Sequence, residues 1–364
     1  DNRSAVFRAT LGDDVSLKHV GCPTVFLSPA NDFHGRIGDL PQTMREISSQ
    51  EWRVTCSPHH NHQDTPEYEV ATQLWFDQHL QGSFAFPRTP ISTLMLNTNS
   101  GVPTLAVRPD RSKLILYVDV YYTQHGKRNE TSRDMQNTVH RVWYHAVAKD
   151  EAGVWTAQLP LSRTNKPLWV YANVVYALEH PVTAAGYYYG SYSARSFNVS
   201  SLLKQVTASQ LQTAGVRATR RPTVVIEDFD ADWQKEWFSY KPDGWARSTH
   251  KIFDATCRAP QGALLALDVQ ADQRNKLVVL IDGYAAEVQL KGGATTQTFV
   301  LSLSDFRNLS GKRLSSWDNI KRLTLSAAER LRPARGDKTP PRLVGGTWRG
   351  NPPRFRRLIW QAKA

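Results

Sequence analysis

Two short polar stretches of the sequence contain the residue types that acid–base catalysis requires. Residues 28–35, SPANDFHG, contain Asp32, and residues 57–63, SPHHNHQ, contain three histidines. A histidine can take a proton from a serine hydroxyl and return it to the leaving group, while a buried carboxylate holds the imidazole in one tautomer. Asp32 and the three histidines are therefore candidates for the acid and the base of a catalytic pair.

The flanking sequence predicts the elements that position these residues. Residues 24–28, TVFLS, are a short apolar run suited to a buried parallel strand, and residues 52–56, WRVTC, predict a second strand. Residues 41–48 predict a short helix with proline in its first turn, and residues 67–80 predict a helix that ends at Gly82. Sites of open α/β sheets lie beyond the carboxyl ends of the strands. Because the acid and the histidines follow two such ends, we expect carboxylate and imidazole to approach within about 2.6–3.2 Å.

In this order of strand, acid, helix, strand and histidine, residues 15–82 resemble the C-terminal part of an α/β-hydrolase of the dienelactone-hydrolase or acetyl-xylan-esterase group, in its multidomain bacterial form. The resemblance implies a serine esterase in which Asp32 is the triad acid and one of His59, His60 and His62 is the base, and we predict His62, with His60 as the alternative. The sequence departs from that pattern because it contains no GxSxG nucleophile elbow. We therefore expect the serine on sequence before Asp1, and we expect this chain alone to be inactive.

Two other interpretations of these loops stay open. Histidines clustered in a loop are often ordinary surface residues, and an aspartate at a strand end often caps a helix. Together with His34 and Asp64, the loop histidines also supply imidazole and carboxylate groups of the kind that bind metal ions. No HExxH or Cys/His finger spacing supports a metal site, and we predict neither a metal nor a cofactor.

The expected fold class is multidomain α/β plus all-β. Residues 1–82 are assigned to an incomplete α/β-hydrolase end, residues 83–205 to an antiparallel β-sandwich, and residues 206–364 to a jelly roll with a basic tail. Short alternating strands with turn signals between them indicate the sandwich. Its aromatic residues suit either stacking on sugars or core packing, and core packing is our prediction. They are Trp169, Tyr171, Tyr176, Tyr192 and the tyrosines at 187–189.

The last domain carries a second resemblance. Residues 226–229, IEDF, and residues 316–325, SWDNIKRLTL, are similar to segments of galactose-binding-like jelly rolls of carbohydrate-active enzymes. The resemblance implies a carbohydrate-binding or a purely structural role. Candidate sugar contacts are Trp233, Trp237 and Trp245. Jelly rolls of this kind often carry structural calcium, for which Asp228, Asp230 and Asp232 are candidates, although alternating aspartates also fit an acidic turn.

The core of this domain is predicted from aliphatic residues that alternate with polar ones at period two, as a two-sheet sandwich requires. The predicted core residues are Val225, Leu265, Leu267, Val279, Ile281, Val288, Val300, Leu303, Ile320 and Leu325.

The composition and charge of the chain argue against a membrane span and against a nucleic-acid partner. The chain has 364 residues, which suffices for two or three domains with sizeable cores. It has no apolar run of about 18 residues, so we predict no membrane span.

The positive charge is concentrated at the C-terminal end. Residues 330–364 hold ten Lys/Arg and one Asp, a net of +9, which leaves only +3 of the formal +12 for the rest. We predict no nucleic-acid partner and interpret this stretch as a solvated extension whose apolar end docks back as a final strand. Attraction to an acidic glycan or nonspecifically to nucleic acid is the alternative.

The three cysteines give little evidence of a disulfide framework. Cys22, Cys56 and Cys257 are odd in number and show no CxxC spacing, so we predict free, buried thiols. A single bridge between Cys22 and Cys56 stays open.

Two classes of function follow. The first is a serine-type carboxylic-ester hydrolase that acts on a small-molecule or polysaccharide ester, with esterified carbohydrate as the expected substrate. The second is a non-catalytic carbohydrate-binding protein that carries a hydrolase remnant. The appended β-domains favour a secreted or periplasmic protein, by analogy alone.

Overall fold

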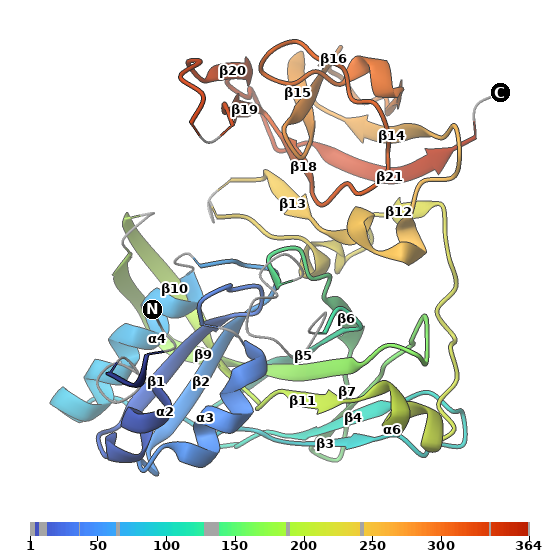
Figure 1. Ribbon diagram of the computed structural model, residues 1–364. Coiled ribbons are helices and arrows are strands. Elements are labelled where there is room, and N and C mark those ends of the chain that lie inside the picture. Colours follow the sequence, from blue (N-terminus) through green and yellow to red (C-terminus); the bar gives the residue numbers. More distant parts are fainter. Residues whose placement is uncertain are drawn as a thin grey trace. The chain divides into compact units, whose positions relative to one another are not determined.

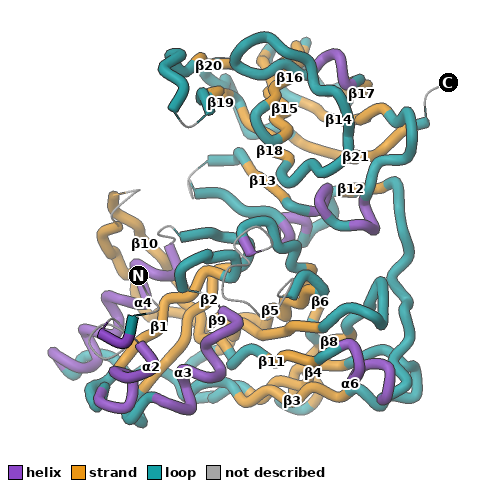
Figure 2. Tube along the Cα trace, in the orientation of Figure 1, coloured by secondary structure: helices purple, strands orange, loops and turns teal. Residues whose placement is uncertain are grey.

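A computed structural model of the chain describes residues 4–6, 13–35, 37–62, 66–126, 138–186, 190–240, 244–334 and 336–362 (Figure 1). The chain divides into two compact units, Asp1–Thr219 and Arg220–Ala364. Strands account for 41% of the structure and helices for 15%, and most strands belong to antiparallel sheets (Figure 2). In the described part of the chain no helix is long and apolar enough to cross a membrane.

The first unit begins with two parallel strands and short helices. The strands β1 and β2 pair in register from Thr24 opposite Trp52 to Pro29 opposite Ser57. The stretch ends at Gly82, whose φ of 67° is the left-handed conformation that glycine adopts without steric cost. The predicted strands and helices of this stretch therefore form, with small shifts at their ends. In chain order the elements are α2 (Asp13–Ser16), η1 (Leu17–His19), β1 (Thr24–Pro29), η2 (Ile37–Asp39), α3 (Leu40–Glu46), β2 (Trp52–Ser57), α4 (Pro66–Phe76) and the π-helical η3 (Asp77–Gln81).

Two antiparallel sheets complete the first unit. One sheet has the order β10-β9-β5-β6, with β11 paired to β9, and the other has the order β3-β4-β8-β7. A short helix, α6 (Ala208–Thr213), follows and is capped by Thr207 and Gln210 in a reciprocal capping box. The strands are β3 (Ile91–Met95), β4 (Thr104–Arg108), β5 (Ile115–Thr123), β6 (Tyr144–Val147), β7 (Lys149–Glu151), β8 (Val154–Gln158), β9 (Leu168–Gly186), β10 (Gly190–Ser200) and β11 (Lys204–Val206).

The expected α/β class, with a truncated α/β-hydrolase end, is wrong. Among the described residues only β1 and β2 form a parallel sheet, and the helix content is far too low for a doubly wound domain. The pair is covered by the antiparallel sheet instead. The hydroxyl of Thr55 donates to the carbonyl of Asn198 at 2.8 Å, and the backbone N–H of Cys56 donates to the hydroxyl of Ser200 at 2.8 Å. Segments expected as separate domains, 1–82 and 83–205, thus lie within one unit and share one core.

That shared core contains the aromatic residues of the middle segment. Trp169, Tyr171, Tyr176 and Tyr192 are all buried, which confirms core packing for these four. Residues 187–189 lie outside the described residues. Trp169 and Tyr171 pack in one cluster with Val54 of β2.

The second unit contains two four-stranded antiparallel sheets, β12-β21-β14-β17 and β13-β18-β15-β16, with a smaller sheet of β19 and β20. Inner residues of both large sheets contribute to one hydrophobic core. The elements are β12 (Val225–Glu227), η4 (Trp233–Glu236), β13 (Arg247–Thr249), η5 (Lys251–Phe253), η6 (Ala255–Cys257), β14 (Leu264–Gln270), β15 (Asn275–Ile281), β16 (Tyr284–Leu290), β17 (Gln297–Leu301), η7 (Leu303–Asp305), β18 (Leu323–Ser326), β19 (Ala328–Leu331), β20 (Arg342–Gly345) and β21 (Arg354–Gln361).

The basic C-terminal stretch is not a solvated extension. It contains part of β19 and all of β20 and β21, and β21 pairs with both β12 and β14. The prediction that its apolar end docks as a final strand is confirmed, because Leu358 and Trp360 are buried in the core.

The core prediction is wrong for two of its residues. Val225 and Val300 are 37% and 46% exposed, whereas seven of the others are buried and Leu303 packs at the edge of the core. Ile359 pairs with Val225 on one side and with Ala266 on the other, and Ala266 pairs with Val300. Directly paired residues share a face, so this row occupies the outer face of the sheet.

All three cysteines are free. Cys56 and Cys257 are buried as expected, but Cys22 is exposed. The pKa of the Cys56 thiol is raised to about 12 by burial, and a hydrogen bond with Ser200 offsets part of that rise.

Candidate functional site

The structure brings Asp32 and His62 together at the ends of the parallel strands. Nδ1 of His62 lies 2.9 Å from Oδ2 of Asp32, within the expected range. An ionised carboxylate only accepts hydrogen bonds, so Nδ1 carries the proton and Nε2 is the basic nitrogen. The other oxygen of Asp32, Oδ1, accepts the backbone N–H of His34 at 2.7 Å. The carboxylate is therefore held on both oxygens.

Exposure differs sharply between the two partners. The side chain of Asp32 is 6% exposed, whereas the imidazole of His62 is 56% exposed. Gly35 passes so close that a Cβ there would lie 3.3 Å from Oδ2 of Asp32. The rings of Phe33 and His34 flank the imidazole, with centroids 5.7 and 4.9 Å away. The arrangement is a buried carboxylate in contact with a solvent-accessible imidazole.

The other two loop histidines occupy structural positions. His59 is 2% exposed and adopts a φ of 65°, which is uncommon for a residue other than glycine. His60 is 9% exposed, and its Nδ1 lies 2.9 Å from the carbonyl of Pro58. Their backbone carbonyls accept hydrogen bonds from the side chain and backbone of Asn31, at 3.3 and 2.9 Å. Of the three candidate bases, only His62 contacts Asp32 in the described structure.

The segment that leads into β6 fixes the loop of Asp32 through Asn31. Nδ2 of Asn31 donates to the carbonyl of Arg141 at 2.9 Å, and Oδ1 accepts the indole N–H of Trp143 at 3.0 Å. The guanidinium of Arg141 donates to the carbonyls of Ala30 and His125 at 3.1 and 2.5 Å. Asn31 and Trp143 have no exposed surface and Arg141 is 3% exposed. We call the hydrogen bonds of Asn31 with Arg141 and Trp143 the Asn31 clamp. Local sequence patterns did not predict this clamp, because its partners lie about 110 residues apart.

The predicted tryptophan contacts of the second unit do not form an open sugar platform. Trp237 is 3% exposed, and its indole donates to Oε2 of Glu227 at 2.6 Å. Trp233 and Trp245 are partly buried against the core. Trp233 meets the ring of Trp237 edge-on at 5.4 Å, and Trp245 lies 6.0 Å from Phe355. Trp237 is therefore a core residue, and the three candidate tryptophans do not share one exposed surface.

A buried ion cluster lies beside Trp237. Nζ of Lys251 lies 2.8 Å from Glu227 and 2.6 Å from Glu236. Burial by itself would lower the pKa of Lys251, but the two carboxylates outweigh it and raise that pKa above its ordinary value. Sequence reasoning did not identify this cluster, which ties β12, η4 and η5 together.

The metal candidates that the structure describes do not gather into a ligand set. In the described part of the chain, no group of three or more His, Cys, Asp or Glu side chains is placed to hold a metal ion. Asp228, Asp230 and Asp232 are exposed, and Oδ1 of Asp230 accepts the backbone N–H of Asp232 at 3.0 Å, as in an acidic turn. Asp64 lies outside the described residues.

Comparison with protein-family models, with curated proteins and with solved structures found no match to this chain.

Proposed function

We propose that Asp32 and His62 are the acid and base of an ester-hydrolysing site. The observation that carries the proposal is the 2.9 Å contact between Oδ2 of Asp32 and Nδ1 of His62, which leaves Nε2 as the basic nitrogen of an exposed ring. In such a pair the carboxylate stays ionised, fixes the tautomer and stabilises the imidazolium that forms when the base takes a proton.

The chemistry assigned to the pair is proton transfer. Nε2 of His62 takes the proton of an attacking hydroxyl while the oxygen of that hydroxyl bonds to the ester carbonyl carbon. The imidazolium then gives the proton to the leaving alkoxide as the single bond between the acyl carbon and the alkoxy oxygen breaks. Where the attacking hydroxyl belongs to a side chain, water then attacks the acyl group with His62 again as base, and the carboxylic acid is released. Asp32 accepts the Nδ1–H bond throughout. The ring contacts Asp32, Phe33 and His34 among the described residues, so the attacking hydroxyl belongs to another segment or to water.

The burial pattern supports catalysis over a merely structural ion pair. More than half of the His62 side chain faces solvent, so its contact with Asp32 is a partly exposed one. An exposed ion pair contributes little to stability, typically about 0–1 kcal/mol. The clamp on Asn31 instead holds the acid loop through buried neutral hydrogen bonds, independently of His62.

The test is ester hydrolysis by the natural protein at its full length. Release of 4-nitrophenol from 4-nitrophenyl acetate, and of acetate from acetylated xylan, is measured for the parent, His62→Ala and His180→Ala. His180 is an exposed histidine on β9 and is the matched control. We expect activity that His62→Ala lowers by about 100-fold or more and that His180→Ala leaves unchanged. Equal rates in parent and His62→Ala, or no hydrolysis of either ester, would overturn the proposal.

A further inference from the structure

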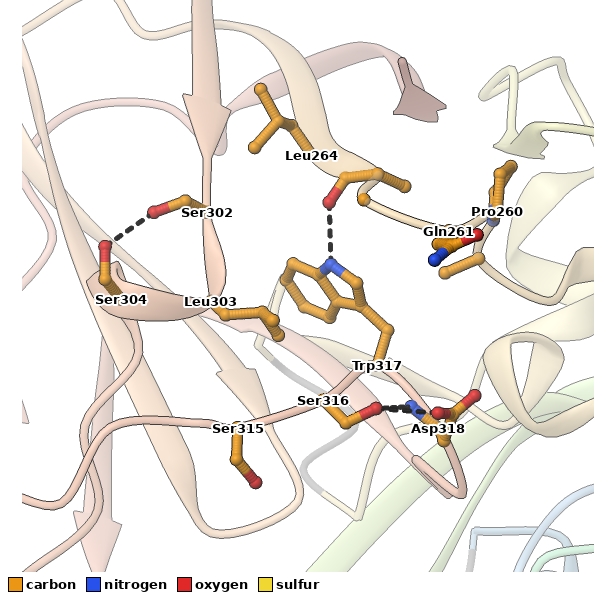
Figure 3. A pocket seen from close by; sticks show the side chains of 13 residues that line it. Pro260, Gln261, Leu264, Ser302, Leu303, Ser304, Ser315, Ser316, Trp317 and Asp318 are labelled. Atoms are coloured by element: carbon orange, nitrogen blue, oxygen red, sulfur yellow. Dashed lines mark hydrogen bonds between the residues drawn. The ribbon is translucent and has the colours of Figure 1, made fainter. Parts of the chain in front are cut away.

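The positive charge of the chain is concentrated in its second unit. Residues 220–364 hold 25 Lys/Arg and 15 Asp/Glu, a net of +10, which leaves +2 of the formal +12 for the first unit. The hollow drawn in Figure 3 does not account for this charge, because Asp318 is the one charged residue among those that line it. A net charge of this size attracts anionic partners, so the arrangement of the cations on the surface decides which partner fits.

Two arginines lie side by side at the rim of the sheet β13-β18-β15-β16. Arg307 pairs with Ala285 of β16 on one side and with Arg313 on the other. Ala285 pairs in turn with Leu280 of β15. Directly paired residues share a face, so both arginines lie on the face of Leu280, which is the face away from the main core. Like charges directly opposite each other destabilise a strand pair, and an anion that contacts both guanidinium groups removes that repulsion.

The hairpin of β19 and β20 brings a third arginine to the same face. The hairpin lies against β15 and β16 (Figure 1). Its Leu331 and Val344 pack in one small cluster with residues of these two strands. Arg342 is paired with Leu331 and so lies on this inner side of the hairpin. Its Nη2 donates to the carbonyl of Asn308 at 3.4 Å, which places the guanidinium at the residue that follows Arg307.

The outer side of the hairpin presents an arginine beside an exposed leucine. Arg330 pairs with Leu343, and both point away from the sheet because the residues next to them along the strands point inward. Leu343 is 63% exposed, more than any other large hydrophobic residue that the structure describes in the second unit. We call Arg307, Arg313, Arg330, Arg342 and Leu343 the basic face.

The arginines of the basic face make no ion pair with a described residue. Elsewhere in the unit, Arg357 lies 3.3 Å from Asp268 and Lys276 lies 3.7 Å from Glu287. The cations of the basic face are thus left for a partner outside the chain. That partner must supply several negative charges and also an apolar region that can take up a leucine side chain.

We propose that the basic face docks the second unit on a lipid bilayer that carries anionic phosphate headgroups. The headgroups offset the arginines, and Leu343 enters the boundary between headgroups and acyl chains. Single-stranded nucleic acid would instead use exposed aromatic rings for base stacking, and the large hydrophobic residues exposed in the described part of this unit are all aliphatic. The proposal does not depend on ester hydrolysis by the first unit.

Vesicle binding by the whole chain tests the proposal. Co-sedimentation is measured with vesicles of phosphatidylcholine alone and of equal parts of phosphatidylcholine and phosphatidylglycerol, and a DNA duplex is titrated in parallel. We expect binding to the anionic vesicles at low salt, little binding to the neutral vesicles, and weaker binding as salt is added. No binding to the anionic vesicles, or equal binding to both kinds, would overturn the proposal.

Variants of the basic face separate a lipid surface from other polyanions. Replacing Arg307, Arg313 and Arg342 together by Gln is expected to weaken vesicle binding by about 100-fold, because each arginine near an anionic bilayer contributes about fivefold. Leu343→Ser is expected to weaken vesicle binding by about tenfold and to leave any binding of the DNA duplex unchanged. Vesicle binding that Leu343→Ser leaves at the parent level would identify a general polyanion surface, nucleic acid included, and would overturn the lipid assignment.

The matched control removes the same charge elsewhere in the unit. It replaces by Gln three exposed arginines that precede β14 or belong to β21 of the other large sheet: Arg258, Arg354 and Arg356. This control is expected to weaken vesicle binding far less than the triple variant of the basic face. Equal losses in the two triple variants would show that net charge alone, and not this surface, accounts for binding.

Discussion

The indole nitrogen of Trp143 donates a hydrogen bond to Oδ1 of Asn31 over 3.0 Å and so links two residues that are 112 positions apart. Asn31 immediately precedes Asp32, and the carbonyl of Arg141 accepts the other end of the same amide. The segment that leads into β6 therefore supports the loop that carries Asp32. This relationship explains how a pair of parallel strands holds its position without a doubly wound sheet around it.

A substitution that removes the indole N–H of Trp143, together with part of the ring, tests this support. Trp143→Phe is expected to destabilise the chain by about 1–3 kcal/mol, because a buried oxygen of Asn31 loses its donor. Urea unfolding followed by circular dichroism measures the effect. Trp75→Phe is the matched control, since Trp75 is also buried and its indole N–H makes no hydrogen bond among the described residues. Equal losses of stability in the two variants would show that ring volume, and not the hydrogen bond, accounts for the effect.

The buried cluster around Lys251 is expected to be costly to break. Lys251→Met leaves Glu227 and Glu236 without their cation and should lower the free energy of unfolding by about 3–5 kcal/mol. Lys312→Met, at an exposed lysine, provides the control for loss of a positive charge. Denaturant midpoints within error of each other for these two variants would refute the assignment.

The same cluster predicts how stability depends on alkaline pH. The pKa of Lys251 is raised in the folded chain, so the folded state keeps this proton at pH values where the unfolded chain has lost it. The stabilisation is fully present below the ordinary pKa of 10.5 and is lost as pH rises from there through the raised folded pKa. Thermal unfolding of the parent should therefore lose more stability above pH 10.5 than Lys251→Met does. Parallel curves for the two proteins would contradict this prediction.

Thiol reactivity should separate the three cysteines. Cys22 is exposed, whereas burial raises the pKa of the Cys56 thiol to about 12 and also raises that of Cys257. Because the thiolate is the reactive form, we expect Ellman's reagent at pH 8 to modify Cys22 rapidly and the other two only after unfolding. Cys22→Ser should abolish the fast phase. A fast phase that survives this substitution would contradict the burial of the other thiols.

Local patterns predicted the elements around the site well. The apolar run at residues 24–28 and the helix that ends at Gly82 form as expected because their signals lie within a few neighbouring residues. The position of Asp32 directly after a strand, and of the histidines after the next, also predicted the carboxylate–imidazole contact. The order of chain segments along parallel strands suffices for that inference.

The sequence did not indicate which segments cover the faces of the strands. A buried parallel strand needs cover, but nothing in residues 52–56 indicates that Asn198 and Ser200 supply it from an antiparallel sheet. We predicted the wrong fold class because the sequence does not show which segment covers this strand. Val300 shows the same limit on a smaller scale, because alternation places it on one face of β17 without saying which face is buried.

The most direct test of the central claim is the kinetics of Asp32→Asn in the natural full-length protein. The amide keeps the shape of the carboxylate but cannot stabilise the imidazolium of His62 in the same way. We predict a fall in kcat of about 10⁴-fold, the size found when the aspartate of a serine-protease triad is replaced by asparagine, with KM nearly unchanged and an unaltered unfolding curve. An Asp32→Asn protein that is folded and hydrolyses esters at the parent rate would contradict it.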